Sequence, residues 1–203
     1  MDTKQKDRQA VSAALVDALG PRSIVMVGMM GAGKTTVGRR LAARLGIPFT
    51  DADAEIEHAA GQSIGDIFAN HGEEAFRDGE RKVIARLLES GPQVLATGGG
   101  AFVCDETRAQ IEKAGVSVWL RADFDTLMRR VRRRSTRPLL SGDDREQVLA
   151  KLMSERYPVY SRADVTVTTR DVPHEVIVGE IVKALMAHFG LAEATAQGDH
   201  DEP

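Results

Sequence analysis

The segment from Gly28 to Thr36 constrains this chain most, because it reads GMMGAGKTT and fits the phosphate-binding pattern G-x-x-x-x-G-K-[ST]. An apolar run of strand type, SIVMV at residues 23–27, comes immediately before it. After it, Val37, Leu41 and Leu45 recur at helical spacing. The segment is therefore predicted to join a buried strand to a helix, which is the context that phosphate binding requires.

The residue types in this loop indicate how it would bind a nucleotide. Its glycines allow a tight bend that points several backbone N–H groups at one spot, and the helix N-terminus adds partial positive charge there. Lys34 is expected to reach the β- and γ-phosphates, and the Thr35 hydroxyl to bind Mg²⁺. The predicted ATP-binding residues of the loop are Gly31, Ala32, Gly33, Lys34, Thr35 and Thr36. The alternative is a glycine-rich turn without a ligand, which the two flanks disfavour.

Strand-like and helix-like segments alternate along the rest of the chain. Further strands are expected just before Asp51 and over 93–97, 116–120 and 164–168, and helices over 8–19, 54–60, 73–90, 105–114, 123–134, 145–157 and 173–189. The last helix is expected to bury Val176, Ile177, Ile181, Val182 and Leu185. This order predicts an α/β fold, a five-stranded parallel sheet with helices on both faces. Ligands of such sheets bind at the carboxyl ends of the strands.

The 203 residues suffice for one α/β domain. The predicted division is an N-terminal helical extension at 1–21, outside the core, an α/β domain at 22–190 that contains the phosphate-binding loop, and an acidic, disordered tail at 191–203. Net charge is −3, which gives no general attraction to nucleic acid or to an anionic membrane. A single cysteine, a polar N-terminus and the lack of a long apolar run predict a soluble cytoplasmic protein.

Two aspartates come directly off the end of the second predicted strand. Asp51 and Asp53 would serve a phosphoryl-transfer site as a carboxylate that holds Mg²⁺ and a carboxylate that orients the attacking hydroxyl and accepts its proton. The third strand has no acidic residue at its end that could hold Mg²⁺, and Asp51 can take that role instead. The alternative is that either aspartate caps the following helix.

The third strand runs into Gly98, Gly99 and Gly100. Three glycines cost backbone entropy, which makes sense if another molecule lies against the main chain. The alternative is a loose loop. Arg77 lies on a predicted helix with Glu73 four residues earlier, so it is either a functional cation or part of a solvated i,i+4 ion pair.

The strongest local charge is the run of arginines from 129 to 134, followed by Arg137. Nucleic-acid binding is one interpretation, but the run has no interleaved aromatic residues and the protein is net acidic. We favour a mobile lid over about 132–145, from which Arg137 supplies a cation to the transition state. Arg156, just before a proline, either grips a carboxylate in a bidentate pair or complements a helix C-terminus.

Taken together, these motifs resemble the shikimate kinase family of small P-loop kinases. The matching stretches are the loop at 28–36, DAD at 51–53, FRDGE at 76–80, TGGG at 97–100, RPLL at 137–140 and RYPVY at 156–160. The resemblance implies a three-layer P-loop fold with strand order 2-3-1-4-5, and usually a monomer. It also implies ATP-dependent phosphorylation of the 3-hydroxyl of shikimate, in the route to chorismate and the aromatic amino acids.

The resemblance also implies a role for individual residues. Lys34 contacts the phosphates, Thr35 binds one Mg²⁺ that Asp51 holds through water, and Asp53 binds substrate hydroxyls and acts as base. The substrate carboxylate is held by Arg77 and Arg156, and a backbone N–H near Gly99 or Gly100 supports a hydroxyl. The lid residue Arg137 reaches ATP, and Arg130 lies on the adenine side. The adenine loop falls near residues 169–173, where individual residues cannot be matched.

Other functions stay open to different degrees. Two arginines and an aspartate would also suit gluconate, so gluconate kinase is the alternative enzyme. Nucleoside-monophosphate kinases are disfavoured because no base pocket is visible. A GTPase switch lacks its guanine-reading N-K-x-D pattern, since Asn70 is the one asparagine. No nucleic-acid or membrane partner is expected.

Overall fold

The computed structural model describes residues 3–132 and 144–191. Its centre is a parallel sheet in the order β2-β3-β1-β4-β5, which confirms the predicted fold class and strand order. The strands are β1 (Ser23–Val27), β2 (Phe49–Asp51), β3 (Val94–Ala96), β4 (Gly115–Arg121) and β5 (Val165–Thr168). All five residues of β1 are buried, as expected for a central strand covered on both faces.

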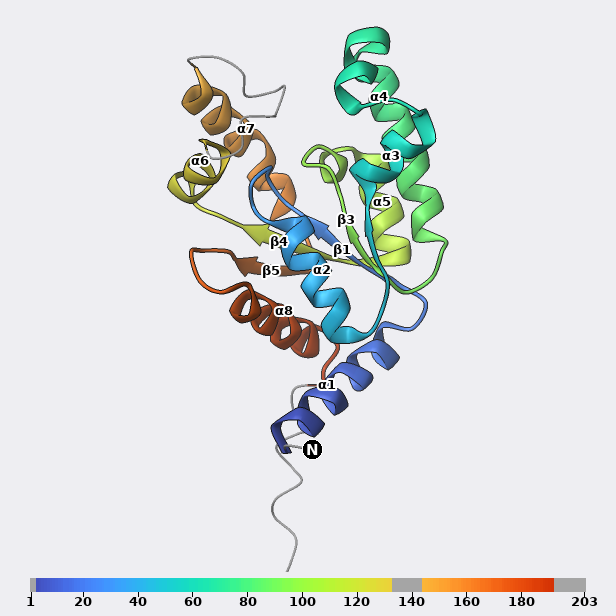
Figure 1. Ribbon diagram of the computed structural model, residues 1–203, viewed down its shortest axis with the longest axis vertical. Coiled ribbons are helices and arrows are strands. Elements are labelled where there is room, and N and C mark those ends of the chain that lie inside the picture. The colour runs from blue at the N-terminus through green and yellow to red at the C-terminus, as the bar shows by residue number, and fades with distance from the viewer. Residues whose placement is uncertain (1–2, 133–143, 192–203) are drawn as a thin grey trace, which may run out of the picture.

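Helices connect the strands and cover both faces of the sheet (Figure 1). Among the described residues they are α1 (Thr3–Leu19), α2 (Lys34–Leu45), α3 (Ala52–Ala60), α4 (Ile64–Leu88), α5 (Asp105–Ala114), α6 (Phe124–Arg132), α7 (Arg145–Tyr160) and α8 (His174–His188), with a 3₁₀ turn, η1 (Ala101–Val103). Helices α2 and α8 pack together on one face, and α4 packs against α5 on the other. The main core lies between the sheet and these helices.

A second, smaller core lies between α3 and α4. It contains Ile56, Ile67 and Phe76, all buried. Helix α4 is interrupted at Gly72, whose backbone has φ 79° and ψ 175°, so its second helical segment begins near Glu73, as expected. The long second segment carries Arg77 toward the carboxyl ends of the strands.

The structure corrects three expectations. The N-terminal helix does not lie outside the core, because Leu15 and Leu19 are fully buried members of the main cluster. Val176 was expected to be buried but is 42% exposed, since the buried stripe of α8 begins at the next residue. Helix α7 does not end before Pro158 but continues to Tyr160 with the proline inside it, so Arg156 does not lie at a helix end.

Other predictions fall outside the described residues. Arg137 and the lid, apart from its edges at 132 and 144–145, are among them, as is the tail from residue 192. Within the part of the chain that the structure describes, no helix is both long enough and apolar enough to cross a membrane.

Candidate active site

The phosphate-binding loop joins β1 to α2, as predicted. Its three glycines all adopt positive φ, with 133° at Gly28, 82° at Gly31 and 101° at Gly33. The Lys34 ammonium lies back across the loop and donates to the carbonyl oxygens of Gly28 at 2.8 Å and Met29 at 3.1 Å. The loop is therefore held in the conformation in which its lysine lies over the cavity that the loop borders.

Thr35 and Asp51 bring two oxygen ligands together beside this loop. The Thr35 hydroxyl donates to one carboxylate oxygen of Asp51 at 2.8 Å. The other oxygen of Asp51 accepts from the backbone N–H of Asp53 at 3.1 Å and caps α3. Asp51 thus both caps α3 and lies in the candidate site, and the capping hydrogen bond fixes the direction of its carboxylate.

Gly98, Gly99 and Gly100 follow β3 as a row of glycines, here called the glycine row, and they lie against four charged side chains. An added Cβ at Gly98 would lie 2.7 Å from Glu80 Oε1 and 3.0 Å from Asp53 Oδ1. One at Gly99 would lie 3.3 Å from Arg156, and one at Gly100 would lie 2.4 Å from Arg77. The glycines are needed because these side chains occupy the space of a Cβ. The loop is not loose, since Ala101 and Val103 donate backbone hydrogen bonds to Gly98 and Gly100.

Arg77 takes part in two ion pairs. It contacts the exposed Glu73 at 3.1 Å, the i,i+4 pair that the sequence suggests, and Glu80 at 2.7 Å. Glu80 is only 2% exposed, and its other carboxylate oxygen has no hydrogen-bond partner among the described residues. Burial, reinforced by the nearby Asp53 carboxylate, raises the pKa of Glu80, although the Arg77 guanidinium opposes the shift. The functional and the ion-pair interpretations of Arg77 are therefore compatible.

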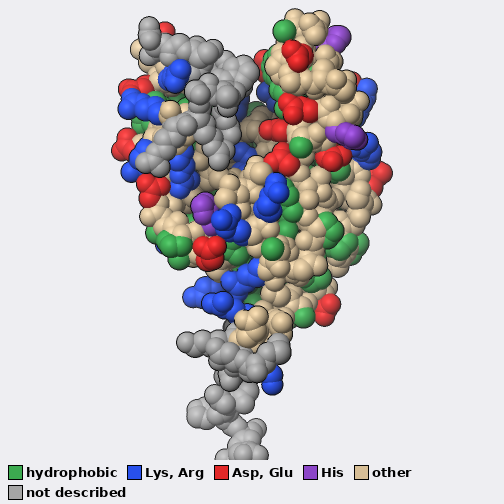
Figure 2. Space-filling model, in the orientation of Figure 1, with side chains coloured by type: hydrophobic (Ala, Val, Ile, Leu, Met, Phe, Trp, Pro, Cys, Tyr) green, Lys and Arg blue, Asp and Glu red, His purple; other side chains and the backbone are tan. Residues whose placement is uncertain are grey.

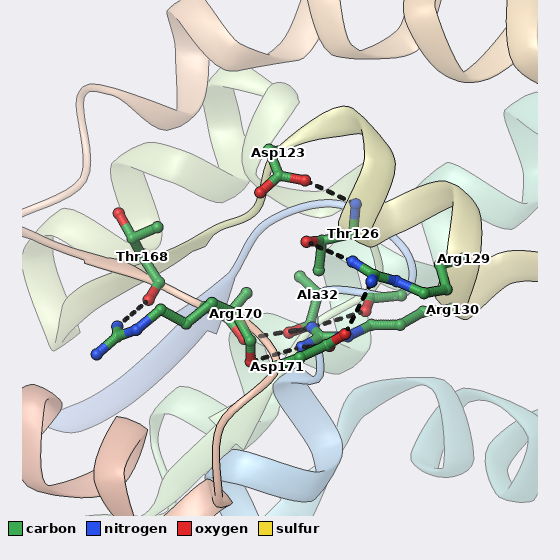
Figure 3. Close-up of polar contacts among 10 residues, drawn as sticks. Ala32, Asp123, Thr126, Arg129, Arg130, Thr168, Arg170 and Asp171 are labelled. Atoms are coloured by element: carbon green, nitrogen blue, oxygen red, sulfur yellow. Dashed lines mark hydrogen bonds and ion pairs between the residues drawn. The ribbon is translucent and has the colours of Figure 1, made fainter.

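Arg130 of α6 joins the phosphate-binding loop to the segment after β5. Its guanidinium donates to the carbonyl oxygen of Ala32 at 3.3 Å, to the Thr169 hydroxyl at 3.2 Å and to the carbonyl oxygen of Arg170 at 2.9 Å. It also contacts Asp171 at 3.4 Å, as Figure 3 shows. Residues 169–172 thus lie beside the phosphate-binding loop. They belong to the segment in which the sequence alone did not identify individual adenine-contacting residues.

One cavity of about 340 Å³ collects most of the predicted residues. It is lined by the loop residues 31–36 and by Asp51, Asp53, Gly99 and Arg130, with residues 169–172 on the same side as Arg130. Arg77, Gly100 and Arg156 are not part of this lining and lie beyond it along the glycine row. Arg137 lies outside the described residues. Gly99 therefore lies between the cavity bordered by the loop at 28–36 and the two arginines, Arg77 and Arg156.

Aromatic side chains of β4 and α7 pack against the phosphate-binding loop and against one another. Trp119 packs its indole ring against Gly28, where an added Cβ would meet it at 3.2 Å. The same ring lies edge-on to Tyr157, with 5.1 Å between ring centroids, and 5.9 Å from Tyr160. The indole nitrogen of Trp119 is buried and has no partner among the described residues.

Sequence reasoning missed two of these residues. Glu80 belongs to the FRDGE stretch but received no role, and its burial beside Arg77 shows only in the structure. Tyr160 closes the RYPVY stretch and contacts Gly99, which is 61 positions away. The helix was expected to end at residue 157, so no helical spacing linked Tyr160 to Arg156 in the sequence.

The surface around α3 and α4 is rich in acid. Figure 2 shows several acidic side chains on this half of the molecule. Glu57 of α3 and Asp66 and Glu73 of α4 are exposed. An anionic ligand would therefore depend on the arginines at the glycine row rather than on the surface around them.

Comparison with known proteins gives a consistent result. Residues 30–186 match the family model for shikimate kinase. The chain is 59% identical over 189 residues to a shikimate kinase of Bradyrhizobium diazoefficiens, covering 93% of this chain and 91% of that protein. It is 56% identical over 195 residues to one of Rhodopseudomonas palustris, covering 96% and 95%. The solved structure of an Acinetobacter baumannii shikimate kinase in complex with shikimate matches with a TM-score of 0.80 and 37% identity, covering 85% of this chain and 97% of that one.

Proposed function

The chain belongs to the shikimate kinase family, small-molecule kinases that use ATP in aromatic amino acid biosynthesis, and we propose that its acceptor atom is the 3-hydroxyl oxygen of shikimate. The observation that carries the proposal is the glycine row. Asp53, Arg156 and Arg77 lie against three consecutive glycines, and consecutive Cα atoms are about 3.8 Å apart. A small cyclic hydroxy acid fits this arrangement, because a hydroxyl at one end could contact Asp53 while a carboxylate at the other end contacts Arg77 and Arg156.

In this reaction, different residues bind the substrate, accept the proton and stabilise the phosphoryl charge. Arg77 and Arg156 bind the substrate carboxylate through paired N–H groups, which fixes the orientation of the ring. Asp53 lines the cavity beside the loop and accepts the proton of the attacking hydroxyl. Lys34 and the loop N–H groups stabilise the charge of the transferring phosphoryl group, and Arg137 adds a cation. A backbone N–H of Gly99 or Gly100 supports a substrate hydroxyl.

The residues present fit a magnesium ion. Thr35 and Asp51 offer hydroxyl and carboxylate oxygens 2.8 Å apart, and such hard oxygens are the ligands that Mg²⁺ prefers. Among residues 3–132 and 144–191, no group of three or more His, Cys, Asp or Glu side chains could hold a metal. This donor set suits an ion that keeps water and phosphate ligands, with Thr35 bound directly and Asp51 through water. The bound ion would neutralise phosphate charge.

We place this reaction on a monomer in the cytoplasm. All the residues assigned above lie on one chain, and the single cysteine fits a reducing compartment. The proposed division is an N-terminal extension at 1–21, a kinase domain at 22–190 with the lid at about 132–145, and a tail at 191–203.

The decisive experiment is a product analysis. Purified protein is incubated with ATP, Mg²⁺ and either shikimate or gluconate, ADP release is followed with coupled enzymes, and the phosphorylated carbon is identified by NMR. We expect turnover with shikimate and phosphate on its 3-oxygen. Turnover with gluconate alone, or phosphate on another shikimate oxygen, would contradict the proposal.

A further inference from the structure

Tyr160 is a fully buried side chain that lies at the meeting point of three parts of the site. It follows Arg156 by four residues on α7, so the two side chains share a helix face. Its side chain is 0% exposed. From this position its hydroxyl reaches both the glycine row and the phosphate-binding loop.

The hydroxyl contacts the Gly99 carbonyl oxygen, the Met29 sulfur and the Arg156 guanidinium. It donates to the carbonyl oxygen of Gly99, and it lies 3.9 Å from the sulfur of Met29 in the phosphate-binding loop. Burial raises the pKa of Tyr160 to about 12, although the Arg156 guanidinium that hydrogen-bonds to this hydroxyl opposes the shift. The hydroxyl therefore stays protonated and remains a donor at physiological pH. A donor at this place is needed because a buried carbonyl oxygen without a partner is costly.

The glycine row needs this outside contact at one peptide in particular. The carbonyl oxygens of Gly98 and Gly100 accept hydrogen bonds from Ala101 and Val103 in the same segment. Gly99 receives its bond from α7 instead. Because glycines leave φ and ψ free, a bond from a rigid helix determines the direction of the Gly99 carbonyl.

That direction also determines where one N–H group points. The carbonyl of Gly99 and the N–H of Gly100 belong to the same planar trans peptide, so they point to opposite sides. Within the described part of the chain, no residue accepts a hydrogen bond from this N–H. It is therefore available to a ligand at the glycine row.

We propose that Tyr160 is a positioning residue for substrate binding: its hydroxyl orients the Gly99–Gly100 peptide so that the Gly100 N–H meets a shikimate hydroxyl, beside Arg156 on the same helix face. This rests on the proposed substrate. Tyr160 does not touch the substrate itself and acts through the peptide that it holds.

The test compares Tyr160→Phe with Tyr157→Phe. Both changes remove one hydroxyl from α7 and keep the ring, but the Tyr157 hydroxyl donates to the carbonyl oxygen of Ala122, away from the glycine row. We measure KM for shikimate, KM for ATP and kcat by ADP release, and Tm by thermal unfolding. Tyr160→Phe should raise the KM for shikimate about tenfold, the scale of one lost buried hydrogen bond, and leave the KM for ATP within about twofold. Tyr157→Phe should change neither, while both variants lower Tm by about 2–4 °C.

Each other outcome contradicts the proposal. Kinetic constants of Tyr160→Phe within twofold of wild type would reduce the hydroxyl to a packing role. An equal rise in both KM values would assign it to the phosphate-binding loop through Met29. The wild-type protein in the same assay separates this test from that of the function, because failure of wild type to use shikimate would overturn the substrate assignment first.

Discussion

Replacing Gly100 by alanine tests the assignment of Arg77 to the substrate carboxylate without touching Arg77 itself. The added Cβ would lie 2.4 Å from one guanidinium nitrogen of Arg77 and 2.7 Å from its central carbon. Ordinary contact begins at 3.4 Å, so the guanidinium has to move by about 1 Å. The atoms displaced are the far end of a flexible side chain, and we expect the protein to fold.

The expected loss follows from the bonds that the shift breaks. Arg77 would leave its 2.7 Å contact with Glu80 and its place at the glycine row. A hydrogen bond to a charged group contributes about 1.5–3 kcal/mol, and 1.4 kcal/mol corresponds to a factor of ten. The KM for shikimate should therefore rise about 10- to 150-fold, with the loss in Arg77→Ala as the upper limit. The KM for ATP should stay within about twofold, because neither residue lines the phosphate cavity.

The matched control is Gly79→Ala. A Cβ at Gly79 meets no atom within 4 Å, and the residue lies inside α4 two positions after Arg77. Alanine in a helix interior is more stable than glycine by about 0.5–1 kcal/mol, so this variant should gain stability and keep its kinetics. Coupled ADP release at varied shikimate and ATP, with urea unfolding of each variant, makes the comparison. A shikimate KM for Gly100→Ala within twofold of wild type would refute the placement of Arg77.

Three further predictions concern other parts of the site. Arg137→Ala should lower kcat by roughly 10³-fold, the scale of a lost transition-state cation. An unchanged kcat in steady-state assays would contradict this role of Arg137. Asp51→Asn should raise the Mg²⁺ concentration for half-maximal rate about 10- to 100-fold, as for other groups that orient a metal from its outer shell; a Mg²⁺ titration that overlays wild type contradicts this. Burial raises the pKa of Glu80, so the folded protein holds this proton more tightly than the unfolded chain; stability from it is present below the ordinary carboxyl pKa and is lost as pH rises through the raised one. Glu80→Gln should lack that loss in urea unfolding across about pH 4–8, and parallel pH curves for the two proteins would exclude it.

Local patterns carried much of the fold. The loop at 28–36 between an apolar run and a helical repeat predicted β1 and α2, and the alternation of elements predicted a parallel sheet with helices on both faces. The strand order came from the family resemblance and is confirmed. The strands and helices themselves are encoded by neighbours in sequence, which is why they could be predicted without a structure, whereas the strand order is not encoded in this way.

Contacts between distant segments could not be read in this way. Leu15 and Leu19 join the main core through packing partners that no local pattern names. Val176 is apolar yet lies about 100° around the helix from Ile177, and only tertiary packing decides which of the two faces the core. The hydrogen bond from Tyr160 to Gly99 joins helix α7 to the segment after β3. Glu80 is buried beside Gly98, which is 18 positions away in the sequence.

The fluorescence of Trp119 can report on the conformation of the phosphate-binding loop. It is the one tryptophan of the chain, so all indole emission comes from a ring packed directly against Gly28 and screened from solvent at 5% exposure. Any rearrangement of the loop on nucleotide binding alters the surroundings of this ring and hence its emission spectrum. Nucleotide affinity can therefore be followed in the unlabelled protein, apart from turnover, in every variant that keeps this residue.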